Sequence, residues 1–162
     1  MAIPARWLRN AGVAVAVGAL IVGCGGGDQP LSRADFTDRV NTECEALKAA
    51  SEDFRKAQNP DAVGPEVTRF LRKASDRLRD LTDNLEGLTP PDVIADDVDK
   101  LIGLLGDYAG GLEELGGDVT AGQSLQGTLN EKSALVERLN KYASDVFDVV
   151  ARLGLTGCVL TT

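Results

Sequence analysis

The sequence has no histidine, and aromatic residues make up only 4% of its 162 residues. Without histidine, the chain cannot build a ferritin-like di-iron site or a C-x-x-C-H haem motif, and a nucleophile would lack its usual imidazole base. With so few aromatic residues, the core must consist mainly of Leu, Val, Ala and Ile, which suits packing of helix on helix. We therefore expect no enzyme activity, no catalytic residue, no metal ligand and no cofactor.

No apolar run is long enough for a transmembrane helix, which needs about 20 residues. The apolar stretch at residues 11–23 carries no charge, and residues 1–10 contain Arg6 and Arg9 but no acidic residue. A basic start followed by a short apolar run is typical of a secretory leader. We predict that residues 1–23 are a signal peptide and that the mature chain does not itself span the bilayer.

The apolar run ends in Ile21-Val22-Gly23-Cys24. This tetrapeptide resembles the lipobox of bacterial prolipoproteins, and the resemblance implies a diacylglyceryl group on the Cys24 thiol, cleavage before Cys24 and fatty acylation of the new amino group. Several lipid chains, at about 0.8 kcal/mol per buried CH₂, give a stable anchor. The expected location is the outer face of the cytoplasmic membrane. Ordinary secretion with Cys24 as a free thiol is the alternative.

Residues 24–31 follow as a lipidated cysteine and a tether, whose Gly-rich part at residues 25–30 contains no side chain suited to packing. Such a composition predicts a flexible tether. From Gly25 to Leu31 the tether reaches at most roughly 25 Å when extended. The folded domain, residues 32–162, is therefore expected close to the membrane surface.

Four segments of that domain place apolar residues at steps of three and four, the spacing of an amphipathic helix. Ser32 starts the first segment as a cap, Thr128 starts a capping box with Glu131 in the fourth, and Gly154 ends the fourth. The predicted helices run from Ser32 to Asn59, Pro65 to Leu88, Asp92 to Leu115 and Thr128 to Leu153. Residues 118–127 suit either a loop or an early turn of the last helix. The pattern predicts an all-α fold, an up-down-up-down four-helix bundle.

The formal charge is −8, from 17 basic and 25 acidic residues. This balance predicts repulsion of nucleic acid and of anionic lipid headgroups, and favours a neutral or basic partner. Six carboxylates could in principle gather a cation, but they lie off the apolar positions and do not follow the calcium-loop motif, so a solvated helix face is favoured. They are Asp92, Asp96, Asp97, Asp99, Glu113 and Glu114.

Two further features of the predicted helices are candidates for binding. Five basic residues in the second helix could bind a phosphate, a glycan acid or an acidic partner. They could instead form ion pairs with neighbouring carboxylates, and this is favoured because no aromatic residue lies between them. Four glycines in the third helix each cost about 1 kcal/mol relative to Ala, which suggests a close helix contact, a kink or a small groove. These residues are Arg69, Arg72, Lys73, Arg77 and Arg79, and Gly103, Gly106, Gly110 and Gly111.

The chain has three cysteines. Once Cys24 is acylated, Cys44 and Cys158 remain as an even pair in an exported protein, which predicts a disulfide between them. In an up-down-up-down bundle the end of the last helix lies beside the start of the first, so the tail after Gly154 can fold back toward Cys44. Two buried free cysteines are the alternative.

Three short motifs of the mature chain resemble a class of small actinobacterial helical lipoproteins that has no assigned activity. They are Phe36-Thr-Asp-Arg-Val-Asn41-Thr-Glu-Cys44, Leu88-Thr-Pro90-Pro91 and Leu153-Gly154-Leu155-Thr-Gly-Cys158. The resemblance implies the architecture and transfers no site. We expect a non-catalytic binding or interaction module of the cell envelope, with an envelope protein or wall component as partner. The alternative is a carrier or sensor of a small apolar ligand within the bundle, and an enzyme ranks third.

Overall fold

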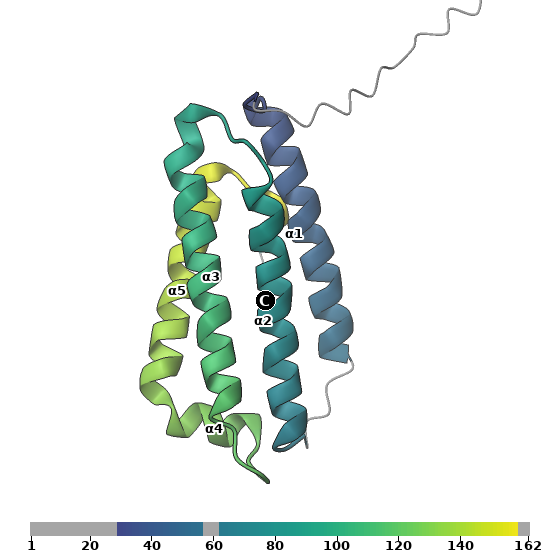
Figure 1. Cartoon of the computed structure of the whole chain (residues 1–162), viewed down its shortest axis with the longest axis vertical. Coiled ribbons are helices and arrows are strands. Elements are labelled where there is room, and N and C mark those ends of the chain that lie inside the picture. The colour runs from purple at the N-terminus through teal and green to yellow at the C-terminus, as the bar shows by residue number, and fades with distance from the viewer. Residues whose placement is uncertain (1–28, 57–61, 159–162) are drawn as a thin grey trace, which may run out of the picture.

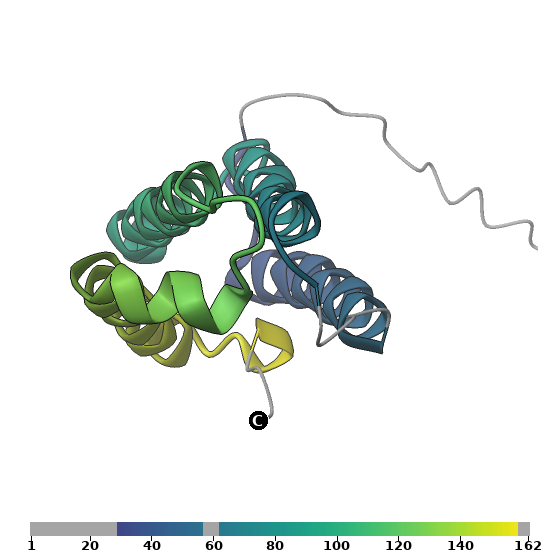
Figure 2. The same cartoon turned by 90° about the horizontal axis from the view of Figure 1, so that it is seen from below.

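The described residues of the chain, 29–56 and 62–158 of a computed structural model, form an all-α structure. Four long helices lie side by side and alternate in direction along the chain, and a short fifth helix crosses one end (Figures 1 and 2). The predicted all-α class is confirmed. The α-helices are α1 (Arg33–Lys56), α2 (Pro65–Glu86), α3 (Ala95–Gly117), α4 (Leu125–Glu131) and α5 (Ser133–Leu153), and two 3₁₀ turns are η1 (Asp92–Ile94) and η2 (Thr156–Cys158).

The main packing joins α2, α3 and α5, whereas α1 packs on α2 and on the C-terminal turn η2. Figure 2 shows η2 in the space between α5 and α1, so the tail after α5 links these two helices at that end. The predicted return of the tail toward the first helix is therefore observed. Within the described residues, no helix combines the length and the apolar character that crossing a bilayer requires.

The predicted starts of the first two helices are confirmed. The Ser32 hydroxyl accepts a hydrogen bond from the Asp35 N–H at 3.1 Å and donates one to the Asp35 carboxylate at 2.7 Å, which satisfies groups that the helix start leaves free. Pro65 occupies the first turn of α2, where its missing N–H costs nothing. The Leu31 N–H also donates to the Thr89 carbonyl at 2.9 Å, which ties the start of α1 to the connection between α2 and α3.

The predicted start of the fourth helix is wrong. Thr128 lies inside α4, and its hydroxyl donates to the carbonyl of Ser124, the residue that caps this helix by accepting from the Gly127 N–H at 3.1 Å. The helical pattern then breaks at Lys132, so a separate short helix precedes α5. The open question about residues 118–127 is answered by a loop to Ser124 followed by the first turn of α4.

The buried apolar residues form two clusters, one near each end of the long helices. The disulfide-end core contains Phe36, Val40, Cys44, Leu81, Leu85, Ile94, Val98, Leu101, Leu105, Val149, Val150, Leu153 and Leu155. The α4-end core contains Val67, Leu71, Leu115, Leu135 and Leu139. Most of these residues lie at the predicted apolar positions. The apolar spacing of the first predicted helix continues after Cys44 through Leu47, Ala50 and Phe54, which lie outside the described side chains.

The glycines of α3 fall into two groups. A Cβ at Gly103, Gly106 or Gly110 would have no neighbour within 4 Å, so these three do not serve a close helix contact. A Cβ at Gly111 would lie 2.6 Å from the Leu139 Cδ2 atom, and one at Gly116 would lie 3.3 Å from the Leu71 Cβ atom. The predicted close approach therefore holds for Gly111, and Gly116 adds a second contact that the sequence did not indicate.

Candidate functional site

The predicted disulfide between Cys44 and Cys158 is confirmed, with a Cα–Cα separation of 4.8 Å. It joins α1 to η2, and the Gly157 N–H beside it donates to the Asn41 side-chain oxygen at 2.9 Å. The two bonds hold the C-terminal turn against α1. Cys24 lies outside the described residues, so its lipidation stays a prediction.

An apolar cavity of about 150 Å³ lies between the long helices and ends at this disulfide. Three helices each contribute three residues to its wall, spaced over two helical turns. The lining is Leu78, Leu81 and Leu85 of α2, Leu101, Leu105 and Tyr108 of α3, and Ala143, Val146 and Val150 of α5, with Cys44 and Cys158. The glycines of α3 are not part of this lining, so the groove that they suggested is not observed among the described residues.

The two ends of the cavity differ. Leu85, Leu101 and Val150 are buried near the disulfide, whereas Leu78 and Tyr108 are half-buried and Ala143 is exposed. Because α2 and α5 run opposite to α3, these last three residues lie at the other end of the lining. Except for the half-buried Cys158, the end at the disulfide is lined by buried side chains and is called the closed end; the most exposed lining residue, Ala143, marks the opening at the other end.

Among the described residues that line the cavity, only Tyr108 has a hydroxyl group. Burial raises the pKa of Tyr108 above its ordinary value, which keeps the phenol neutral and able to donate. Its hydroxyl makes no hydrogen bond with any described residue. The tyrosine side chain is mostly apolar and ends in a polar hydroxyl, so it suits a site that binds a ligand with one apolar end and one solvent-exposed end.

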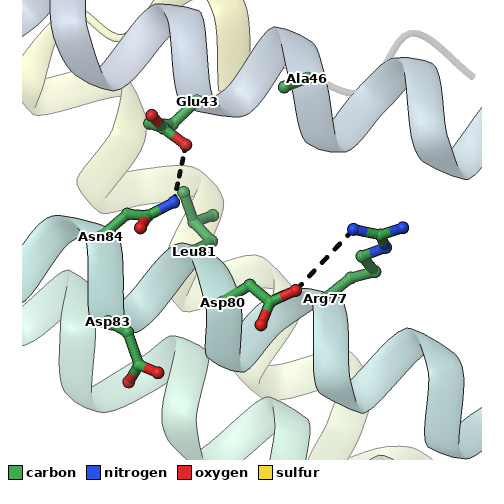
Figure 3. Close-up of a pocket in the computed structure, with 7 residues that line it drawn as sticks. All are labelled: Glu43, Ala46, Arg77, Asp80, Leu81, Asp83 and Asn84. Atoms are coloured by element: carbon green, nitrogen blue, oxygen red, sulfur yellow. Dashed lines mark hydrogen bonds and ion pairs between the residues drawn. The ribbon is translucent and has the colours of Figure 1, made fainter.

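A second hollow, of about 360 Å³, lies on the surface between α1 and α2 (Figure 3). The Asn84 amide donates to the Glu43 carboxylate at 2.8 Å across it, and Arg77 lies 3.8 Å from Asp80 along α2. These groups are largely exposed and pair with one another. Such exposed pairs contribute little energy and leave no buried polar group for a ligand to satisfy.

The predicted pairing of the basic residues on α2 holds for two of the five. Arg77 pairs with Asp80, and Arg79 pairs with Glu113 of α3. Arg69, Arg72 and Lys73 are exposed and form no ion pair within the described residues. The first two line an open groove of about 450 Å³ at the start of α2, beside the loop before α4.

The six candidate carboxylates do not converge. Asp97 pairs with Arg152 of α5, and Glu114 pairs with Arg138 of the same helix. The hydrogen bond from Arg152 is the main cause that lowers the pKa of Asp97 and raises that of Arg152, and both groups are solvent-exposed. No group of three metal-ligating side chains is present in residues 29–56 and 62–158.

No protein-family model matches this chain, and neither a curated protein nor a solved structure is significantly similar to it. The function must therefore be argued from the residues themselves. The cavity is the feature that sequence reasoning missed. Its one signal is Ala143, a small residue at an apolar position of a helix whose neighbouring apolar positions carry Val and Leu.

Proposed function

We propose that this chain is a lipoprotein, anchored through Cys24 on the outer face of the cytoplasmic membrane, whose residues 32–162 form a four-helix-bundle binding module. The observation that supports export most directly is the Cys44–Cys158 disulfide. Structural disulfides persist in oxidising compartments and are rare in the cytoplasm. The disulfide uses two of the three cysteines, so Cys24 is left for the lipid.

The structure suggests how an anchored domain would be oriented. The described chain starts at the disulfide end, where Leu31 is hydrogen-bonded to Thr89, and α4 lies at the opposite end (Figure 1). A tether of residues 24–31 attached at this point spans roughly 25 Å at most. The proposed orientation places the disulfide end near the bilayer and turns α4 and the start of α2 toward the wall.

Binding is favoured over catalysis by the surroundings of the titratable groups. Asp97, Lys141 and Arg152, whose pKa values shift, are exposed partners in surface ion pairs, and Tyr108 is shifted by burial alone. Acid–base catalysis needs a sheltered group whose pKa is moved toward neutrality. The proposed partner is an envelope protein or a wall component, and the acidic surface favours a neutral or basic contact that weakens with salt.

The anchor is tested by replacing Cys24→Ala in the full chain and following its size and its membrane fraction in cells. We expect the wild-type chain to be shortened and membrane-bound, and the variant to keep its leader. A Cys44→Ala/Cys158→Ala chain is the matched control, because it loses the disulfide but should still be cleaved and anchored. A Cys24→Ala chain that is processed to the same size and stays in the membrane would refute the proposal.

The apolar cavity favours a second candidate function, carriage of a small apolar ligand. A dry cavity of comparable volume in another protein binds benzene or xenon. We expect saturating benzene to raise the melting temperature of the wild-type chain, because a ligand that binds only the folded state stabilises it. An unchanged melting temperature would count against this function and would leave the anchor proposal intact.

A further inference from the structure

We infer that the cavity between α2, α3 and α5 binds the end of a straight alkyl chain, carried by a single-chain amphiphile such as a fatty acid. This inference rests on the carrier function proposed above and specifies its ligand class. The alkyl end lies toward the Cys44–Cys158 disulfide, and the polar head stays at the opening beside Ala143 and Tyr108.

The chemistry of the wall selects an apolar ligand. Except for the Tyr108 hydroxyl and the two disulfide sulfurs, the described side chains that line the cavity are Leu, Val or Ala. None of them carries a charge. A charged or strongly polar group of a ligand would therefore lose its bound water at the closed end without gaining hydrogen bonds in return. The apolar part of a ligand must therefore occupy the closed end.

The shape of the cavity favours a straight chain over a fused ring system. On each helix the first and last lining residues are seven residues apart, Leu78 and Leu85, Leu101 and Tyr108, and Ala143 and Val150. At 1.5 Å per residue this is roughly 10 Å along the helices, so the 150 Å³ are spread over a narrow section. An extended alkyl chain fits such a space along its length, and the single ring of benzene can occupy part of it, whereas a fused ring system is too broad.

The opening selects an amphiphile. Ala143 both lines the cavity and is exposed, so a ligand can enter there without displacing a large side chain. The Tyr108 hydroxyl lies at the same end of the lining, and a carboxylate or hydroxyl headgroup would accept its hydrogen bond.

The test is calorimetric titration of the full chain with a series of fatty acids from butanoate to dodecanoate. We expect affinity to rise about fourfold for each added methylene, the fold-change that corresponds to burying about 0.8 kcal/mol per CH₂, until the chain outgrows the cavity. Beyond that length the affinity should level off. Absence of saturable binding, or affinity that keeps rising through dodecanoate as in micelle formation, would overturn the inference.

Two substitutions of the same kind on α5 locate the site. Ala143→Leu fills the opening, and we expect it to weaken octanoate binding at least tenfold. Ala151→Leu is the matched control, because Ala151 is also exposed on α5 but does not line the cavity, and its binding should equal the wild type. Tyr108→Phe should weaken octanoate severalfold and leave benzene binding unchanged. Equal octanoate binding by the Ala143→Leu and Ala151→Leu chains would refute the site.

Benzene separates this inference from the function on which it rests. If benzene binds the wild-type chain and not the Ala143→Leu chain, while no fatty acid binds, the cavity accepts apolar ligands and the alkyl-chain inference is wrong. If neither binds, both the carrier function and the inference fail.

Discussion

The two ends of the helices are held together in different ways. Among the described side chains, the disulfide-end core has thirteen buried residues and includes residues from α1, α2, η1, α3, α5 and the segment after α5. The described part of the α4-end core has five, from α2, α3 and α5. The loop at this end is held by backbone contacts such as the hydrogen bond from the Gly64 N–H to the Gln123 carbonyl at 2.9 Å. The covalent link should make the disulfide end the last to open.

The largest expected effect comes from the disulfide itself. Cys44 and Cys158 are separated by 114 residues, and a link that closes so long a loop stabilises by about 4–5 kcal/mol on the chain-entropy model. We expect the free energy of unfolding of the Cys44→Ala/Cys158→Ala chain, measured with urea, to be lower than that of the wild type by this amount.

Hydrogen exchange should show which end of the molecule loses stability. Backbone amides at the disulfide end, which exchange last in the wild type, should approach the exchange rates of the α4 end in the variant. Addition of reductant to the wild type should reproduce this result and should leave the variant unchanged. A urea midpoint that does not move on reduction would contradict the expected role of the disulfide.

Two tightly packed glycines, the buried Gly111 and the half-buried Gly157, allow the ends to be compared by one kind of substitution. A Cβ at Gly157 would lie 2.7 Å from the backbone oxygen of Asn41, which cannot move without shifting α1. A Cβ at Gly111 would instead meet a methyl of Leu139, which has rotational freedom. We expect Gly157→Ala to cost about 1–3 kcal/mol in urea unfolding and Gly111→Ala to cost less.

The control for both substitutions is Gly103→Ala. Gly103 is exposed in α3 and a Cβ there would meet nothing within 4 Å, so the substitution should stabilise by up to about 1 kcal/mol through helix propensity. If Gly157→Ala unfolds at the same urea concentration as Gly103→Ala, the tight contact between η2 and α1 is wrong.

The sequence was most informative where one residue decides the local outcome. Ser32 and Pro65 start helices because of their own side chains, and Gly154 ends α5 with a φ of 75° that few other residues adopt. The disulfide followed from counting cysteines in an exported chain. In each case the deciding chemistry is local or allows only one pairing.

The sequence failed where the outcome depends on packing. Ser124 and Thr128 are both acceptable helix caps, and the choice between them is made by the loop, because Gln123 is bonded to Gly64 and Ser124 pairs with Val63. The cavity depends on the combined volumes of side chains from several helices, of which Ala143 is only one. Neither property can be read from a single segment.

Ser75 is a wholly buried residue of α2. Its hydroxyl has no hydrogen-bond partner among the described residues, and a buried polar atom without a partner is destabilising. We expect Ser75→Ala to raise the free energy of unfolding by about 1 kcal/mol. Ser144→Ala, at an exposed position of α5, measures the part due to helix propensity alone. Equal gains from the two substitutions would show that the buried hydroxyl carries no penalty.

The smallest expected effect is a pH dependence at the disulfide end, where the Arg152 guanidinium donates to the Asp97 carboxylate at 2.8 Å. This hydrogen bond holds the pKa of Asp97 below its ordinary value of 3.8. A lowered folded-state pKa means that the stabilisation is present above the unfolded value and is lost as pH falls through the folded value. Because both groups are exposed, the contribution is small and is screened by salt.

Asp97→Asn should therefore reduce the slope of stability against pH on the acid side, below about pH 4. The matched control is Asp96→Asn, because Asp96 is exposed one residue away and forms no ion pair with a described residue. Urea unfolding of the three chains between neutral and acid pH, at low and at high salt, gives the comparison. We expect the Asp97→Asn curve to separate from the other two at low salt and to rejoin them at high salt. Identical acid slopes for the wild type and Asp97→Asn at low salt would mean that the ion pair between α3 and α5 contributes nothing to holding this end of the molecule together.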